Sequence, residues 1–294
     1  MGRQFKGYLA SLVATLLLLL VACDSGTSPP AEGQPAVPTR SGNSSNPAPA
    51  PGAQVTAEAR DIVAETLPYA EVDERLVYGH FVFPVDMVDP LPGVILIHER
   101  WGLDEGTKAL ADQLAARGYV VLAIDLFGGN VATNGEESRQ LILPVVENQA
   151  TAEENIRQAY EFLLNTAQAP RIGAIGWSFG GNWALNTAML YPDDLDAAVI
   201  YYGQLTSNED RLGPVNVPIL GIFGENDRRI TSDKVSEFEA ALAELDKTYQ
   251  IEVYPGVGHA FADPTGSNYE ETTASEAWSV VLSFLGEHLA AGPD

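Results

Sequence analysis

A serine between glycines stands where it could act as a nucleophile. Residues 176–180 read Gly-Trp-Ser-Phe-Gly and match the pattern G-x-S-x-G, in which a tight turn between a strand and a helix presents the serine hydroxyl. Glycines suit the flanking positions because neighbouring chains approach such a turn closely. The following helix directs its first N–H groups to the same place, where they can stabilise an oxyanion. The pattern predicts nucleophilic catalysis by Ser178; the alternative is a glycine-rich turn without a catalytic role.

A serine hydroxyl is a weak nucleophile near neutral pH and needs a base. The chain has 4 histidines. His259 follows the last expected strand in a loop that contains glycine, the place where a serine hydrolase built on a parallel sheet carries its base. His80 and His288 lie far from that edge and read as surface or core residues. His98, which ends a strand next to Glu99, is ambiguous.

The base in turn needs an acid that orients it. Asp227 follows an expected strand in the segment Gly-Glu-Asn-Asp at 224–227, and we prefer it to Glu225; the alternative is a solvated loop carboxylate. The chain order Ser178, Asp227, His259 is the order found in α/β-hydrolases and differs from the orders of two unrelated protease folds. Agreement in residue type, order and place after a strand predicts a catalytic triad.

Short apolar runs alternate with helical patterns and must position these residues. Strands are expected at 94–98, 119–125, 171–176, 197–201, 218–223 and 249–254, and helices at 108–117, 151–165, 232–245 and 273–289. This alternation predicts an α/β-hydrolase fold of class α/β, with a mostly parallel central sheet and helices on both faces. Residues 127–148 are the least regular part and are expected to form a loop or a small lid.

The N-terminal segment has the features of an export signal. Arg3 and Lys6 precede an apolar stretch that ends at Cys23, and the run Leu-Val-Ala-Cys at 20–23 resembles the lipobox of bacterial lipoproteins. We therefore expect a lipoprotein signal peptide at 1–22 and a lipid on Cys23, which would place the protein in the cell envelope, anchored to a bacterial membrane and facing outside the cytoplasm. The alternatives are an ordinary secretory signal or an uncleaved anchor.

Three segments are expected along the chain. After the signal peptide, residues 23–54 are rich in Pro, Ser, Gly and Ala, a composition typical of a disordered linker. Residues 55–294 have the composition of one catalytic domain.

Composition and motifs exclude several classes of function. A formal net charge of -24 repels nucleic-acid phosphates, so no nucleic-acid partner is expected. The single cysteine excludes a disulfide within the chain and a cysteine metal cluster, and no zinc, dinucleotide or phosphate-loop motif occurs. We expect no metal and no cofactor, contact with the membrane through the lipid only, and a monomer that acts on a small molecule.

Residues from about 60 to 290 resemble the dienelactone hydrolase family. The matching segments are 97–102 (Ile-His-Glu-Arg-Trp-Gly), 118–126 (Gly-Tyr-Val-Val-Leu-Ala-Ile-Asp-Leu), 175–181 (Ile-Gly-Trp-Ser-Phe-Gly-Gly), 224–227 and 258–261 (Gly-His-Ala-Phe). The resemblance implies that Ser178 is the nucleophile, His259 the base and Asp227 its partner. It also implies an oxyanion hole formed by the backbone N–H groups of Arg100 and Phe179, with Glu99 beside the nucleophile.

Two departures from that family bear on the substrate. The family's type enzymes carry cysteine where this chain has Ser178, and arginines that bind a substrate carboxylate at positions that look like Gly129 and Asp263 here. An acidic Asp263 would repel a carboxylated lactone instead of binding it. The chain looks like the family's serine-containing esterases.

The roles of the remaining candidates stay open. Glu99 is either a structural carboxylate or a catalytic one. Trp101 and Trp177 either line an apolar pocket or pack in the core. The sequence predicts hydrolysis of a carboxylic ester or lactone through an acyl-enzyme. The rivals are an amide or peptide hydrolase, which needs the same triad, and a binding lipoprotein that has kept the fold without activity.

Overall fold

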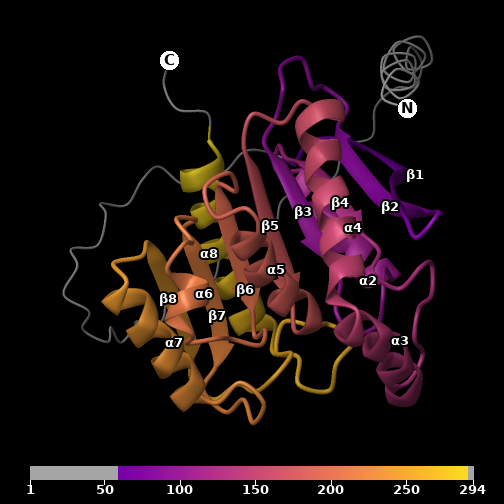
Figure 1. The fold of residues 1–294 in the computed structure, drawn as a ribbon. Helices are drawn as coiled ribbons and strands as arrows, with labels where there is room; N and C mark the ends of the chain where they lie inside the picture. The colour runs from indigo at the N-terminus through magenta and orange to yellow at the C-terminus, as the bar shows by residue number, and fades with distance from the viewer. Residues whose placement is uncertain (1–58, 291–294) are drawn as a thin grey trace, which may run out of the picture. The chain divides into compact units, whose positions relative to one another are not determined.

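The computed structural model describes residues 59–290, and Figure 1 draws the rest as a grey trace. The predicted signal peptide at 1–22, the lipid on Cys23 and the linker at 23–54 lie outside the described residues. Those three expectations therefore stay predictions. The described residues form one compact unit.

A mostly parallel sheet runs through this unit (Figure 1). Its 8 strands lie in the order β1-β2-β4-β3-β5-β6-β7-β8. The strands are β1 Ile62–Val72, β2 Arg75–Pro84, β3 Gly93–Ile97, β4 Val120–Ile124, β5 Ile172–Trp177, β6 Ala197–Tyr201, β7 Ile219–Gly224 and β8 Tyr249–Tyr254. β2 pairs antiparallel with β1 and β4, and the pairs from β4 to β8 are parallel. The carboxyl ends of the parallel strands therefore meet at one edge.

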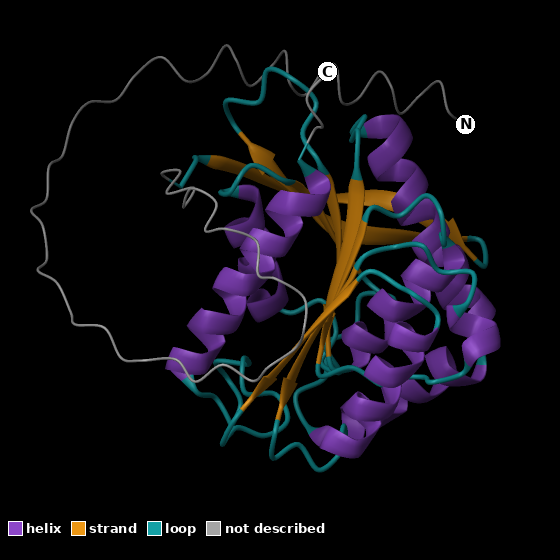
Figure 2. Ribbon diagram, turned by 90° about the vertical axis from the view of Figure 1, so that its left-hand side faces the viewer, coloured by secondary structure: helices purple, strands orange, loops and turns teal. Residues whose placement is uncertain are grey.

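Helices cover both faces of the sheet (Figure 2). They are α2 Glu105–Ala115, α3 Gly135–Glu147, α4 Gln149–Glu161, η1 Phe162–Thr166, α5 Phe179–Leu190, α6 Glu209–Leu212, α7 Ser232–Glu244 and α8 Glu271–Leu289. Side chains of α2 and α8 share one core cluster with strand residues, and α5 packs against β5 and β6. The prediction of an α/β-hydrolase fold is confirmed.

The central strands are buried on both faces, which explains their continuous apolar sequences. In β3, Val94 and Leu96 point into the cluster with α2 and α8, whereas Ile95 and Ile97 lie outside that cluster. All four side chains are fully buried. Successive strand residues point to opposite faces, so a strand covered on both sides needs apolar residues at every position.

The hairpin of β1 and β2 was not predicted from the sequence. Its strands mix buried, half-buried and exposed residues, in contrast to the fully buried central strands. The turn at Asp73 and Glu74 has positive φ at both residues, 49° and 60°, the geometry that hairpins prefer. Neither residue is glycine or asparagine, so the usual sequence signal for this turn is missing.

The expected loop at 127–148 is partly a helix. The side chain of Asn134 caps α3 by accepting hydrogen bonds from the N–H groups of Glu136 and Glu137. Only Ser138 of α3 is buried, and Pro144 lies inside the helix. A proline in the interior argues against a helix, which explains why this one was not predicted.

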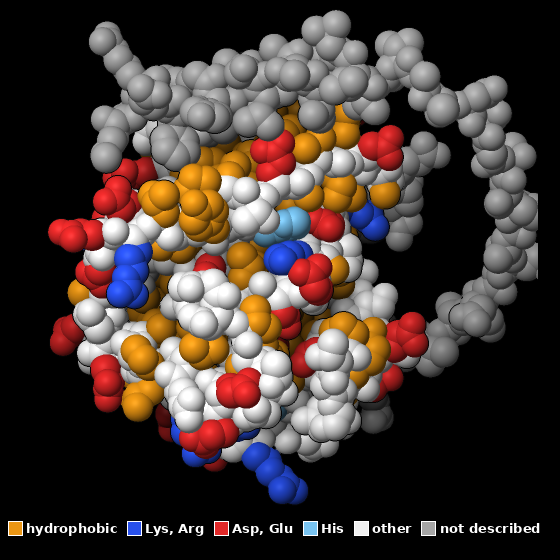
Figure 3. All heavy atoms as spheres, turned by 90° about the vertical axis from the view of Figure 1, so that its right-hand side faces the viewer, with side chains coloured by type: hydrophobic (Ala, Val, Ile, Leu, Met, Phe, Trp, Pro, Cys, Tyr) orange, Lys and Arg blue, Asp and Glu red, His pale blue; other side chains and the backbone are white. Residues whose placement is uncertain are grey.

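The acidic composition is visible on the surface. Acidic side chains are spread over the face shown in Figure 3, which lies at the right of Figure 1, with few basic ones between them. Within the described range, no helix is both long enough and apolar enough to cross a membrane.

Candidate functional site

Ser178 occupies the sharp turn between β5 and α5. β5 ends at Trp177, α5 begins at Phe179, and the serine between them has φ 50° and ψ -105°. A positive φ is strained for a residue with a side chain, and such strain needs support from the surroundings. The Ser178 N–H donates to the carbonyl of Tyr201 on the neighbouring strand at 2.9 Å, which contributes that support.

The glycines on either side of Ser178 are required by close contacts of the backbone. A Cβ at Gly176 would overlap the carbonyl of Gly180. A Cβ at Gly180 would overlap the carbonyl of Ile97 and would lie 2.6 Å from that of His98. The first turn of α5 thus sits directly on the end of β3, which brings two segments distant in sequence to the same point.

Ser178, His259 and Asp227 form a hydrogen-bonded chain. The Ser178 Oγ lies 2.9 Å from His259 Nε2, and His259 Nδ1 lies 2.7 Å from Asp227 Oδ2. With Nδ1 donating to the carboxylate, Nε2 is left to accept the serine proton. The Asp227 side chain is fully buried, and that of His259 is 16% exposed. The three residues predicted as a triad are therefore brought together.

The environment keeps Asp227 ionised. Burial alone would raise the pKa of this carboxyl. Hydrogen bonds from His259 and from the N–H groups of Ile230 and Arg229, the last two at 3.0 and 2.7 Å, outweigh the burial and hold the pKa below its usual value. A carboxylate that accepts several hydrogen bonds is stabilised in its charged form. Asp227 can therefore hold a histidine that becomes positive.

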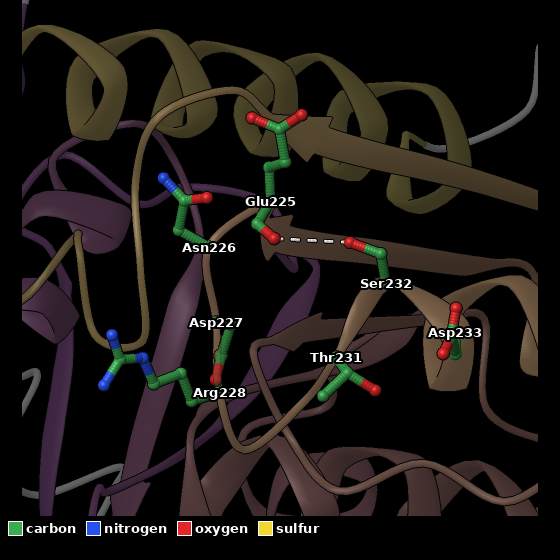
Figure 4. A pocket seen from close by; sticks show the side chains of 7 residues that line it. All are labelled: Glu225, Asn226, Asp227, Arg228, Thr231, Ser232 and Asp233. Carbon is green, nitrogen blue, oxygen red and sulfur yellow. Dashed lines mark hydrogen bonds between the residues drawn. The ribbon is translucent and has the colours of Figure 1, made fainter.

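Glu225, the alternative acid, does not reach His259. Figure 4 shows its side chain pointing away from Asp227. Its carboxylate accepts from the N–H of Gly256 at 3.1 Å, while the N–H of Asn226 donates to the carbonyl of Val257 at 2.9 Å. These bonds join the loop after β7 to the loop after β8, and so hold Asp227 next to His259. The open hollow of about 730 Å³ in Figure 4 is lined by residues 225–228 and 231–233, a lining without Ser178 or His259.

Two backbone N–H groups that the sequence singled out have no acceptor among the described residues. Those of Arg100, after β3, and Phe179, at the first position of α5, donate to no other described residue. The first N–H groups of a helix have no partner inside it and carry a partial positive charge. These are the two N–H groups expected to form an oxyanion hole.

Glu99 is held by a residue that the sequence analysis missed. The hydroxyl of Tyr202 donates to Glu99 Oε1 at 3.2 Å. Burial, strengthened by the nearby negative charge of Asp263, raises the pKa of Glu99 to about 7, although the bond from Tyr202 opposes the rise. The buried ring of Tyr202 lies 5.2 Å from that of His259. Tyr202 directly follows β6, at the edge where the parallel strands end, and this position could have marked it as a site residue in the sequence.

The other histidines have partners away from Ser178. His80 bonds to Asp112 with 2.8 Å between Nε2 and Oδ1, and the ring of His288 packs on Phe284. His98 is fully buried and bonds to backbone groups through both ring nitrogens. Of the four, His259 is the one within hydrogen-bond distance of Ser178.

The two tryptophans have different surroundings. Trp177 is 4% exposed and stacks on Tyr201 in the cluster with α2 and α8. Its side chain leaves the strand on the face that α2 and α8 cover, so of the two alternatives left open for this residue, core packing accounts for it. Trp101 is partly exposed beneath the guanidinium of Arg100, 4.2 Å from its ring centre.

The positions compared with substrate-binding arginines have no positive charge. The N–H of Gly129 donates to Asp125 Oδ2. Asp263 accepts from the N–H and hydroxyl of Thr265, and its charge is felt by Glu99. Among residues 59–290, no group of three or more His, Cys, Asp or Glu side chains is arranged to hold a metal ion.

Similarity to known proteins covers most of the chain. Residues 78–289 match the model described as "Dienelactone hydrolase family". "Protein usf" of Aquifex pyrophilus is 29% identical over 205 residues, which are 67% of this chain and 89% of that protein. "Putative carboxymethylenebutenolidase" of Aquifex aeolicus (strain VF5) is 28% identical over 205 residues, with the same two coverages, 67% and 89%. The solved structure of a "Putative Dienelactone Hydrolase" from Klebsiella pneumoniae subsp. pneumoniae MGH 78578 superimposes with a TM-score of 0.70 at 25% identity, covering 78% of this chain and 100% of that chain.

Proposed function

Because the chain belongs to the dienelactone hydrolase family and is a hydrolase of the lactone or ester type, we propose that Ser178 is its nucleophile and that the reaction passes through an acyl-enzyme. The observation that carries this proposal is the hydrogen-bonded chain from Ser178 through His259 to Asp227, with distances of 2.9 and 2.7 Å. Such a chain raises the nucleophilicity of a serine that would otherwise be weak.

The proposed reaction has two halves. In the first, Ser178 Oγ attacks the carbonyl carbon while its proton passes to His259 Nε2, and the N–H groups of Arg100 and Phe179 hold the resulting oxyanion. The intermediate collapses, the C–O bond of the leaving alcohol breaks, and that oxygen takes the proton from His259. In the second half, water attacks the acyl carbon with His259 again as base, and the acid and free Ser178 are released.

The substrate is proposed to be a small ester or lactone without a carboxylate near the scissile bond. Support comes from charge: Asp263 and Gly129 stand where the family's arginines are expected, and Glu99 and Asp263 lie close enough for one charge to affect the other. A substrate carboxylate there would be repelled. Partly exposed Trp101 is a candidate wall for an apolar substituent.

We also propose that the protein acts from the outer side of a membrane through a lipid on Cys23, as a monomer. The sequence at 20–23 is the support for the lipid. Metabolic labelling with an alkyne fatty acid tests it, with Cys23→Ala as the control that should carry no label.

Hydrolysis of p-nitrophenyl esters by the full chain tests the proposed function. Ser178→Ala and His259→Ala should each lower kcat by roughly 10⁴ to 10⁶, since members of a triad act as a unit. Ser236→Ala, an exposed serine on α7, is the matched control and should leave kcat unchanged. Equal rates in wild type and Ser178→Ala would refute the proposal.

Two further measurements separate the rivals. Matched ester and anilide substrates distinguish an esterase from an amide hydrolase, and we expect the ester to be cleaved far faster. A fluorophosphonate should label wild type and fail to label Ser178→Ala; absence of labelling in wild type would instead support a binding protein that has kept the fold.

A further inference from the structure

His98, which the proposed mechanism does not use, is fully buried at the end of β3 with both ring nitrogens bonded. The N–H of Leu126 donates to Nε2 at 3.1 Å. Since Nε2 therefore accepts, the ring proton of the neutral imidazole is on Nδ1. Nδ1 donates it to the carbonyl of Glu99, 2.6 Å away. The two contacts define one tautomer and one ring orientation.

The carbonyl of Glu99 belongs to the same peptide group as the N–H of Arg100. In a planar trans peptide the C=O and N–H bonds point in opposite directions. The oxygen is held by His98 at 2.6 Å and, at a longer distance of 3.3 Å, by the N–H of Gly102. Bonds that hold the oxygen also fix where the N–H points, and the shorter one comes from His98. It also polarises the peptide group, which strengthens the N–H as a donor. His98 thus acts on one of the two N–H groups that have no acceptor among the described residues.

His98 also lies against the residue that carries the second N–H group. Its ring is nearly parallel to that of Phe179, with 6.0 Å between the centroids and 19° between the planes. The ring of Phe127 packs on it at 4.6 Å, and its own carbonyl is covered by Gly180. One buried side chain therefore contacts both segments that supply N–H groups to the oxyanion.

The partner of Nε2 is itself anchored. Asp125 precedes Leu126 and accepts from the N–H of Phe127 at 2.8 Å. The side chain of Asn155 on α4 donates to the Asp125 carbonyl at 2.8 Å and accepts from the hydroxyl of Tyr69. These bonds hold the loop after β4 in place, so the imidazole is clamped between a fixed donor and the peptide that it orients.

We propose that His98 is a positioning residue, whose neutral Nδ1–H tautomer holds the Glu99–Arg100 peptide with its N–H directed at the oxyanion. The proposal rests on the proposed function. Since His98 is fully buried, its effect on the substrate would pass through the Glu99–Arg100 peptide. A charged ring would set a proton on Nε2 against the N–H of Leu126, and burial, which lowers the pKa of His98, acts in the same direction.

Two amide variants separate this role from simple packing. His98→Asn places an amide nitrogen near the position of Nδ1, so it can still donate to the Glu99 carbonyl. His98→Gln places its amide near Nε2, so it keeps an acceptor for Leu126 and loses the bond to Glu99. Both are polar, but Gln is close to His in volume and Asn is smaller, so the free energy of unfolding of each variant is measured beside its activity. His80→Gln, which changes a histidine bonded to Asp112 away from Ser178, is the control.

The readouts on the full chain are kcat and KM for a p-nitrophenyl ester, and Ki for a trifluoromethyl ketone that forms an oxyanion on Ser178. We expect His98→Gln to lower kcat on the order of ten- to a hundredfold, less than the loss of an entire oxyanion donor. KM should change by less than about threefold, and Ki should rise in parallel with the fall in kcat. His98→Asn should recover most of the activity, and His80→Gln should match wild type.

Equal kcat in His98→Asn and His98→Gln would overturn the proposal, as would a fall in kcat without weaker ketone binding. If neither variant folds, wild type is assayed with an ester and with the matching thionoester, because sulfur accepts hydrogen bonds weakly. We expect kcat/KM to be at least a hundredfold lower for the thionoester. A smaller difference would mean that no oriented N–H donor is present. If His98→Gln keeps the kcat of wild type while Ser178→Ala is inactive, the positioning role of His98 is refuted and the proposed function stands. If wild type and Ser178→Ala turn over the ester at the same rate, both the proposed function and the positioning role of His98 are refuted.

Discussion

The Tyr202 hydroxyl donates a hydrogen bond of 3.2 Å to the carboxyl group of Glu99. Glu99 directly precedes Arg100, whose N–H is one of the two expected oxyanion donors. The bond from Tyr202 gives a donor to a carboxyl group that is only partly exposed to water. Because burial and Asp263 raise its pKa to about 7, Glu99 changes charge within the range in which esterases are assayed. A carboxylate at this place would oppose the developing oxyanion, whereas the neutral acid would not.

The stability of the fold should depend on pH through Glu99. The pKa of this group rises from an ordinary 4.5 to about 7 on folding, so between these values the folded state keeps a proton that the unfolded state has released. The free energy of unfolding should therefore fall as pH rises through this window, by roughly 2 kcal/mol. Glu99→Gln should remove this part of the dependence and be more stable than wild type at pH 8. Urea titrations at pH 5 and 8 measure it, with exposed Glu237→Gln as the control; parallel curves for wild type and Glu99→Gln would contradict it.

The two loop carboxylates after β7 should differ in their effect on catalysis. Asp227→Asn removes the charge that stabilises a positive His259 and should lower kcat by about 10⁴. Glu225→Gln changes a bond to the N–H of Gly256 and should lower kcat by less than tenfold. Steady-state kinetics on the ester substrate compare the two, and similar losses would mean that the acid has been misassigned.

Glycines that look alike in sequence should respond differently to alanine. Gly180→Ala forces a Cβ onto the carbonyl of Ile97 and should destabilise the fold by about 3 kcal/mol or more. Gly286 lies in α8, and a Cβ added there would meet no atom within 4 Å, so Gly286→Ala should stabilise by about 0.5 to 1 kcal/mol. Thermal unfolding measures both shifts, and a stable Gly180→Ala would show that the turn can open.

Substrate charge should affect the rate through Asp263. A neutral ester should be hydrolysed about tenfold faster, by kcat/KM, than a matched ester with a carboxylate on its acyl part, which corresponds to about 1.4 kcal/mol of repulsion. Asp263→Asn should reduce the ratio of kcat/KM between the neutral and the charged ester. Glu237→Gln, which removes an exposed carboxylate, should leave this ratio unchanged. A preference of wild type for the charged ester would contradict the proposed substrate class.

Most of the central sheet and the positions of the triad residues could be predicted from the sequence. β6 and β8 have the expected bounds, and Ser178, Asp227 and His259 follow the strands that were expected to position them. These elements are predictable because strands buried on both faces leave unbroken apolar runs and because the turn at Ser178 needs glycines.

The remaining parts leave weaker signals. α3 buries only Ser138 and contains Pro144, a residue that argues against a helix in a sequence. The end of the expected helix at 151–165 winds as η1, a difference that periodicity does not detect. Tyr202 bonds to Glu99, a residue distant along the chain. His98 bonds to the carbonyl of its neighbour Glu99 and to the N–H of Leu126. No spacing rule in the sequence predicts these contacts.

The hydrogen bond between Ser178 and His259 joins residues 81 positions apart, and β8 must pair with β7 before the imidazole reaches the hydroxyl. During synthesis the serine therefore leaves the ribosome long before its base. A growing or interrupted chain carries a hydroxyl with ordinary reactivity. The order of the residues along the polypeptide thus means that the proposed acyl transfer needs β8, the last strand of the described residues, in place.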